Sequence, residues 1–396
     1  MCLAHIASMT GFAAFPALLP ALQPLWALSN TEAGWINGIF FAGYVSAVPV
    51  MVSMTDRVDA RHIYILGLAI STLGLAGFAL AAHDFWSGLI WHAIAGVGVG
   101  STYMTGLKVM TDRLPKPAPS RAVAIYAAMF STGAAGSFAL NGAIGGWFGW
   151  QAAFAVSAVG PALAIVLALA MLRARPPAAG ERPQTALLDF RPVLKNRTAI
   201  GYMLGYAGHS WELFALRGWL VAFLVYAGIG GPDGAGEAAA VAAAASLVGV
   251  PSTIFGNELA QRFGRRRVIL SVMSVATLVS CVVGFAASLP AGLLIALVFV
   301  YSVAIMGDSG SLTAGTAAAA QTGYGGATLA LHSILGFGGA FFGPLAVGLV
   351  LDTVNGSGGG AASDLGWGLA FIAMGLGSAM GAVGLVWAHR RQGNAA

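Results

Sequence analysis

The chain has 396 residues, of which 58% are hydrophobic and only 8% are charged, and its mean hydropathy is +0.81. Soluble domains carry about 25% charged residues, so this composition excludes a soluble enzyme or binding domain and predicts a polytopic membrane protein. The net charge of +5 is explained below by membrane topology, and we expect no nucleic-acid partner.

Apolar segments, each about long enough to cross a ~30 Å bilayer core, recur along the chain. They lie at about 3–27, 33–54, 62–82, 88–110, 122–146, 152–172, 199–226, 238–256, 268–289, 290–312, 324–350 and 366–388. The stretch between the sixth and seventh segments is rich in arginine and proline, as is typical of a linker. The sequence therefore predicts an all-α membrane protein with twelve transmembrane helices in two six-helix bundles. The bundles are residues 1–172 and 198–396, the second with a short cytoplasmic tail, and residues 173–197 are a cytoplasmic linker.

The basic residues give the orientation. If both termini are cytoplasmic, all but one of the 19 Lys and Arg residues fall in cytoplasmic connections, and the exception is Arg217. Such an asymmetry follows the positive-inside rule. We expect a multi-pass protein of the cell inner (plasma) membrane, and the richness in glycine and alanine favours a bacterial source.

The fourth segment contains Gly96, Gly98 and Gly100. A phosphate-binding loop would need a flanking strand and a lysine, so these glycines predict close helix packing instead. With no nucleotide motif, no metal-ligand cluster and no visible nucleophile, we expect neither an enzyme nor a cofactor. Tyr103 and Asn141, in the fourth and fifth segments, are candidates for the lining of a central cavity.

The seventh segment carries His209, Glu212 and Arg217 far from its ends. Each charge at bilayer depth costs roughly 2.5–3.5 kcal/mol, so these side chains should face protein or a wet cavity. On a continuous helix, Glu212 and Arg217 are separated by about 140° of rotation. A direct ion pair would need a break in the helix, which the glycines of this segment permit. The two charges are then either functional or a structural pair.

Two related stretches beside the second and eighth segments, VSMTDRVDAR at 52–61 and NELAQRFGRR at 257–266, resemble a family motif. The motif is G-x-x-x-D-R-x-G-R-R, and it is typical of the major facilitator superfamily. The residues kept are Asp56, Arg57 and Arg61 in the first copy and Arg262, Gly264, Arg265 and Arg266 in the second. Asp59 stands at a glycine position of the first copy. The resemblance implies a cytoplasmic latch that holds neighbouring helices in one access state; the alternative is that these arginines only determine topology.

The resemblance implies a secondary transporter that moves a small, possibly anionic, organic solute by alternating access, with proton coupling. We expect Arg217, His209 and Trp211, with Tyr103 and Asn141, to bind the substrate. Glu212 and Asp308, an acid in the tenth segment, are the expected proton-coupling groups, although Asp308 is equally suited to break its helix. The expected unit is a monomer whose partners are the solute, protons and the lipid bilayer.

Two alternatives stay open. One is proton-antiport efflux of amphipathic compounds, which an aromatic cavity lining would favour. Against it, Gly142 stands where the antiporter signature has a proline. The other is a non-transporting membrane sensor on the same fold, which would usually carry a longer signalling tail.

Overall fold

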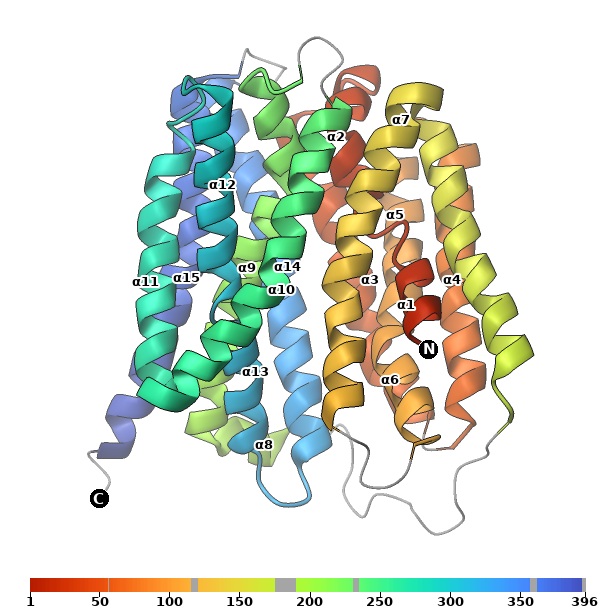
Figure 1. Ribbon diagram of the computed structural model, residues 1–396, viewed down its shortest axis with the longest axis vertical. Coiled ribbons are helices and arrows are strands. Elements are labelled where there is room, and N and C mark those ends of the chain that lie inside the picture. The colour runs from red at the N-terminus through yellow and green to blue at the C-terminus, as the bar shows by residue number, and fades with distance from the viewer. Residues whose placement is uncertain (56, 115–119, 175–189, 231–234, 357–361, 394–396) are drawn as a thin grey trace. The chain divides into compact units, whose positions relative to one another are not determined.

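The computed structural model describes residues 1–55, 57–114, 120–174, 190–230, 235–356 and 362–393, and these form helices and loops without a strand (Figure 1). The helices of the first half are α1 Cys2–Ser8, α2 Ala14–Leu25, α3 Asn30–Met54, α4 Ala60–Ala81, α5 Phe85–Gly100, α6 Tyr103–Thr111 and α7 Ser120–Met171. Those of the second half are α8 Arg191–Lys195, α9 Arg197–Tyr226, α10 Ala235–Phe263, α11 Arg265–Val283, α12 Ala291–Met306, α13 Ser309–Ala318, α14 Gly325–Asn355 and α15 Asp364–Gly393.

The helices account for the predicted spans once their breaks are considered. The first, fourth and tenth spans are each divided, into α1 and α2, α5 and α6, and α12 and α13. Helix α7 holds the fifth and sixth spans and turns between them at Gly149, whose φ of 85° lies in the left-handed region that favours glycine. Within the described residues, eight helical stretches are individually long and apolar enough to cross a membrane. The all-α fold is confirmed, and the twelve predicted spans fit these helices.

The chain forms two compact units. Unit 1 comprises Met1–Leu28, Trp35–Arg182 and Leu220–Leu247, and unit 2 comprises Ser29–Gly34, Pro183–Trp219 and Val248–Ala396. Residues 175–189, within the expected linker, lie outside the described residues. The bundle boundaries expected from the sequence therefore stay a prediction.

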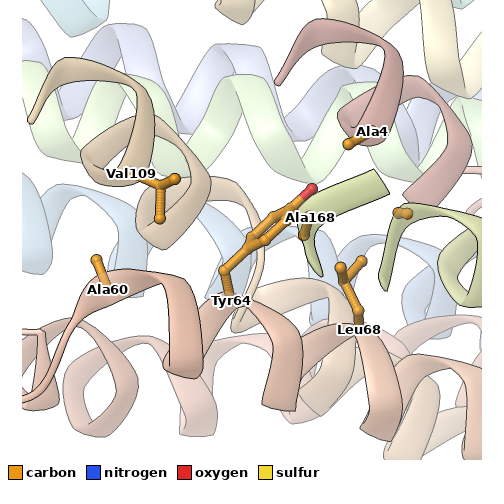
Figure 2. Close-up of a cluster of buried hydrophobic side chains, with 7 residues drawn as sticks. Ala4, Ala60, Tyr64, Leu68, Val109 and Ala168 are labelled. Atoms are coloured by element: carbon orange, nitrogen blue, oxygen red, sulfur yellow. The ribbon is translucent and has the colours of Figure 1, made fainter. Parts of the chain in front are cut away.

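In unit 1, α4 packs against α5 and α7, and α1 packs against α7. Figure 2 shows one buried cluster of this unit, in which the ring of Tyr64 on α4 lies among small side chains such as Ala4 and Ala168. Close packing also involves the glycines of α5. A Cβ at Gly96 would lie 2.0 Å from the carbonyl oxygen of Phe40, and one at Gly98 would lie 2.3 Å from the amide nitrogen of Ser71. The prediction that these glycines serve helix packing is confirmed.

In unit 2, α11 and α14 pack against α15, and α11 also packs against α12. One core cluster joins α9 to its neighbours through residues that are all buried: Tyr202, Ile269, Met273, Leu312 and Leu385. Near its start, α9 is thereby held among α11, α13 and α15. This packing positions the charged residues of α9 described next.

Candidate functional site

Helix α9 is continuous from Arg197 to Tyr226, so it does not use the break that its glycines permit. Its glycines allow close packing instead. A Cβ at Gly208 would lie 2.2 Å from the carbonyl oxygen of Gly377 in α15. Because the helix is continuous, Glu212 and Arg217 stay on different faces, and they form no ion pair in the part of the chain that the structure describes.

Glu212 is fully buried and is held by neutral hydroxyl groups from two other helices. Tyr301 of α12 donates a hydrogen bond of 2.7 Å to Oε1 of Glu212. Ser378 of α15 donates a hydrogen bond to Oε2. A buried carboxyl group whose partners among the described residues are neutral hydroxyl groups is well suited to take up and release a proton, because its charged form is costly to bury.

His209 lies one helical turn before Glu212 and contacts the break between α12 and α13. Its Nδ1 is 2.8 Å from Oδ1 of Asp308, and both side chains are 2% exposed. The two atoms are within ion-pair distance but are not aligned as a hydrogen bond. Asp308 occupies the residue just before α13, so it lies at the helix break as well as beside a titratable group.

Arg217 is 7% exposed, and its guanidinium group lies 5.6 Å from the centroid of the Phe214 ring. It makes no ion pair with any residue that the structure describes. Trp211, six residues earlier, donates a hydrogen bond of 2.9 Å from its indole nitrogen to the carbonyl oxygen of Ala373 in α15. Trp211 therefore fixes α9 to α15, whereas Arg217 has no acidic partner among the described residues.

The other two candidate substrate-binding residues, Tyr103 and Asn141, belong to unit 1. Tyr103 forms an aromatic group with His5 and Tyr126, with ring centroids 5.4 Å and 5.8 Å from its own. Asn141 is fully buried, and its amide donates to the carbonyl oxygen of Thr10 at 2.8 Å. Ser157 donates to its Oδ1 at 2.9 Å. Asn141 thus helps to satisfy the carbonyl oxygen of Thr10, which lies at the break between α1 and α2.

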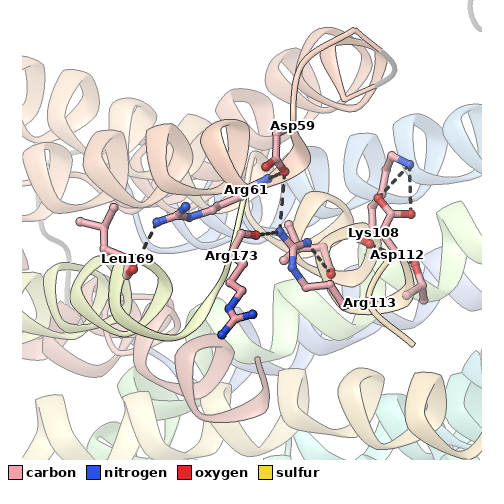
Figure 3. A network of polar contacts seen from close by, with 9 residues as sticks. Asp59, Arg61, Lys108, Asp112, Arg113, Leu169 and Arg173 are labelled. Atoms are coloured by element: carbon pink, nitrogen blue, oxygen red, sulfur yellow. Dashed lines mark hydrogen bonds and ion pairs between the residues drawn. The ribbon is translucent and has the colours of Figure 1, made fainter. Parts of the chain in front are cut away.

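The first copy of the arginine motif is described except for Asp56, which lies outside the described residues. Arg57 is exposed. Figure 3 shows the network that the structure places there. Arg61 donates to the carbonyl oxygen of Leu169 in α7 at 3.2 Å. Asp59 caps α4 by accepting from the amide of Arg61 at 2.9 Å, and it lies 3.8 Å from Arg113. Arg61 therefore joins the start of α4 to the end of α7.

The second copy has a different geometry. Gly264 turns the chain between α10 and α11 with a φ of 94°. Arg262 lies 5.4 Å from the centroid of the Phe263 ring, and the buried Nε atoms of Arg265 and Arg266 have no hydrogen-bond partner among the described residues. None of these three arginines forms an ion pair with a described residue.

Sequence reasoning missed the hydroxyl partners of Glu212 and also Asp59 and Arg113. Tyr301 and Ser378 are ordinary residues of apolar segments, and nothing in the sequence links them to Glu212. In the family motif, Asp59 is only a departure from a glycine position. Its place just before an apolar segment is the signal that could have identified it as a helix cap.

A family model described as the Major Facilitator Superfamily matches residues 1–344. The chain belongs to this superfamily. Facilitator-superfamily transporters are not enzymes, and membership agrees with the all-helical architecture described above.

The sequence is similar to those of several spinster homologues. The Arabidopsis thaliana protein named "Probable sphingolipid transporter spinster homolog 2" is 27% identical over 210 residues, which cover 48% of this chain and 43% of that protein. Protein spinster homolog 1 of Homo sapiens is 22% identical over 218 residues, which cover 52% of this chain and 41% of that protein. The matched stretch thus spans less than half the length of these relatives.

Two solved structures share the fold. A bacterial homolog to the human lysosomal transporter Spinster, in an inward-facing and occupied conformation, has a TM-score of 0.79 and 18% sequence identity, with 98% of this chain and 95% of that chain covered. The nucleoside transporter NupG has a TM-score of 0.73 and 14% identity, with 98% of both chains covered. At these identities the likeness establishes the fold alone.

Proposed function

We propose that this protein is a secondary transporter that moves one small organic solute by alternating access and uses protons as the coupling ion. The observation that carries the proposal is the buried set of α9, in which Glu212, His209 and Arg217 lie inside apolar packing. Ionisable groups within membrane-spanning helices are costly and typically mark substrate or proton pathways.

Arg217 is the proposed anchor for the solute. Its guanidinium group is almost completely buried and pairs with no described acid, so an anionic or carbonyl group of a solute would supply the missing acceptor. A guanidinium group binds a carboxylate with two parallel hydrogen bonds, which gives orientation as well as attraction. His209 and Trp211, on the same helix, complete the proposed contacts in unit 2, and Tyr103 and Asn141 are proposed for unit 1.

Glu212 and Asp308 are the proposed proton-coupling groups. The support is that each carboxyl group is buried, Glu212 with hydroxyl partners and Asp308 beside His209. Protonation removes the charge that burial disfavours. Because Glu212 lies on α9 together with the proposed anchor Arg217, the solute and a proton on Glu212 change the electrostatics of the same helix. This shared helix provides a physical means of coupling.

The arginine motif is proposed as the cytoplasmic latch. Supporting this, Arg61 bonds to a carbonyl oxygen at the end of α7, and the last carbonyls of a helix attract cations. We also propose Asp56, Arg57, Arg262, Arg265 and Arg266 as members of the latch. Their positions in the family motif are the basis for including them.

A second candidate substrate class is amphipathic compounds, exported by proton antiport. Two observations favour it: curated relatives are named as sphingolipid transporters, and unit 1 contains an aromatic group around His5. His5 stacks on Tyr126 with ring centroids 4.7 Å apart, and Phe130 lies 6.4 Å away. Aromatic faces of this kind suit an apolar chain or a quaternary ammonium group.

The proposed setting is the inner membrane of a bacterial cell, with both termini in the cytoplasm. The proposal rests on the distribution of basic residues along the sequence. We propose a monomer as the working unit, with no nucleic-acid partner and no cofactor.

Purified protein in proteoliposomes tests the function directly. An imposed pH gradient should drive accumulation of one member of a panel of labelled organic acids, amines and amphipathic lipids, and a protonophore should abolish the accumulation. Saturable binding without flux of any member would favour the sensor and would contradict the transport proposal.

A further inference from the structure

Two threonines of α13 face the ring of His332, a buried histidine of α14. Oγ1 of Thr316 lies 3.1 Å from Nδ1, and Oγ1 of Thr313 lies 3.3 Å from Nε2. His332 is 4% exposed. Both ring nitrogens therefore have hydroxyl partners, and the positions of the hydroxyl protons decide which protonation state the site fits.

A threonine hydroxyl has one proton to donate. That of Thr316 is directed to the carbonyl oxygen of Leu312 at 3.0 Å, and that of Thr313 to the carbonyl oxygen of Ser309 at 3.2 Å. With these protons engaged, each hydroxyl offers only lone pairs to the ring. All four contacts are hydrogen bonds only when both ring nitrogens carry protons, which is the imidazolium form. A neutral ring leaves one of the four contacts without a proton.

We propose that His332 is a proton-binding site of this protein, loaded through Thr313. The inference rests on the proposed proton coupling and assigns a further group to it. Its ring stacks on Tyr206 of α9 with centroids 4.0 Å apart, and an aromatic face attracts a cation. The titratable groups on this side are Tyr206, then His209, whose ring lies 5.7 Å from that of Tyr206, and Asp308 beside His209.

The difference in exposure between the two threonines indicates the route by which a proton reaches His332. Thr313 is exposed, whereas Thr316 and His332 are buried. When Nε2 carries only a lone pair, the hydroxyl of Thr313 turns from Ser309 and donates to it. An incoming proton then bonds to Oγ1 while the original hydroxyl proton passes to Nε2. One O–H bond forms, one O–H bond breaks and one N–H bond forms, and the new hydroxyl proton is directed to the carbonyl oxygen of Ser309. Because burial opposes the charge while the hydroxyl contacts favour it, proton binding at His332 depends on both threonines.

The test is a pH titration of ¹⁵N-histidine-labelled full-length protein in lipid nanodiscs, with the His332 signals assigned as those absent from His332→Gln. We expect both ring nitrogens of His332 to convert to the N–H form as the pH falls. Thr313→Val and Thr316→Val should each weaken proton binding by about tenfold, since each removes a hydrogen bond to a charged group. Thr313→Ser and Thr316→Ser keep the hydroxyl group and should bind the proton at His332 as strongly as the unmodified protein.

Thr328→Val is the matched control, because the hydroxyl of Thr328, also on α14, donates to the carbonyl oxygen of Tyr324 at 2.7 Å. It should leave the titration unchanged. A His332 ring that stays neutral throughout the pH range in which the protein is folded overturns the proposal. So do valine variants of Thr313 and Thr316 that titrate like Thr328→Val.

Transport provides the second readout. His332→Gln should keep solute exchange down a concentration gradient and lose accumulation driven by a pH gradient. Accumulation that persists in this variant overturns the role of His332 in coupling. If the unmodified protein moves no solute at all, the proposed function fails, and the titration still decides whether His332 binds a proton.

Discussion

Tyr301 donates a hydrogen bond of 2.7 Å to Glu212, and so connects α12 to a carboxyl group buried in α9. Ser378 of α15 donates to the other oxygen of the same group. Three helices of unit 2 therefore meet at one side chain. Both donors are neutral, so these two contacts are hydrogen bonds and not ion pairs.

The first prediction concerns this hydrogen bond. Tyr301→Phe leaves one oxygen of a buried carboxyl group without its donor, which costs about 1–3 kcal/mol of folding free energy. We expect a lower midpoint of thermal unfolding in detergent. Tyr64→Phe is a matched control, because the hydroxyl of Tyr64 is buried but has no hydrogen-bond partner among the described residues. Equal destabilisation by the two variants would show that the contact to Glu212 contributes nothing specific.

The sequence predicted the helices well, because a span must be long and apolar and its backbone groups must be satisfied within it. It also predicted that the charges of α9 are buried. It did not predict their partners. The partner of Glu212 is 89 residues away, and the contact depends on how α12 is rotated against α9, which no local pattern specifies. Glycine spacing likewise permitted a break in α9, but tertiary packing decided that those glycines serve helix contacts.

The second prediction concerns Asp59. Asp59→Asn keeps an acceptor for the amide of Arg61 but loses the charge that faces Arg113 at 3.8 Å. A partly exposed ion pair of this kind contributes about 0–1 kcal/mol, so stability should hardly change. If the network works as a latch, the transport rate should fall while solute binding stays within a few fold. Asp112→Asn, which disrupts the half-exposed pair of Lys108 and Asp112, is the control and should transport normally.

The third prediction concerns topology. In a background without Cys2 and Cys281, single cysteines at the exposed positions His83 and Ser288 should react with an impermeant thiol reagent outside intact cells. Cysteines at the exposed positions Ala174 and Gln321 should react only after permeabilisation. Labelling of Ala174 in intact cells would reverse the proposed orientation.

The fourth prediction concerns pH. Asp84 and Ser87 form a capping box at the start of α5, and the hydrogen bonds from Ser87 hold the pKa of Asp84 below its ordinary value of 3.8. Because the pKa is lower in the folded state, the cap stabilises the folded protein at pH values above the pKa that Asp84 has in the unfolded chain. This contribution disappears as the pH falls through the pKa of Asp84 in the folded protein. In Ser87→Ala, carboxyl NMR should find the pKa of Asp84 returned towards 3.8. An unchanged pKa would contradict the role of the cap.

The fifth prediction separates function from structure in α9. Arg217→Lys should raise the apparent Michaelis constant sharply, because a point charge replaces a two-pronged hydrogen-bonding group. Arg217→Ala should abolish uptake. Glu212→Gln mimics the protonated carboxyl group, so it should keep solute exchange down a concentration gradient but lose accumulation driven by a pH gradient.

A purely structural role for the two charges predicts a different pattern. Both single variants would then fold poorly, since each leaves an unmatched buried charge, and the double variant Glu212→Gln with Arg217→Ala would regain stability and pH-driven transport. The absence of an ion pair between Glu212 and Arg217 argues against that pattern, because a pair that is not in contact gives the double variant nothing to restore. Thermal unfolding and proteoliposome transport of the three variants decide the matter. Recovery of pH-driven transport in the double variant would remove Glu212 from the coupling mechanism and leave Asp308 and His332 as the groups to test.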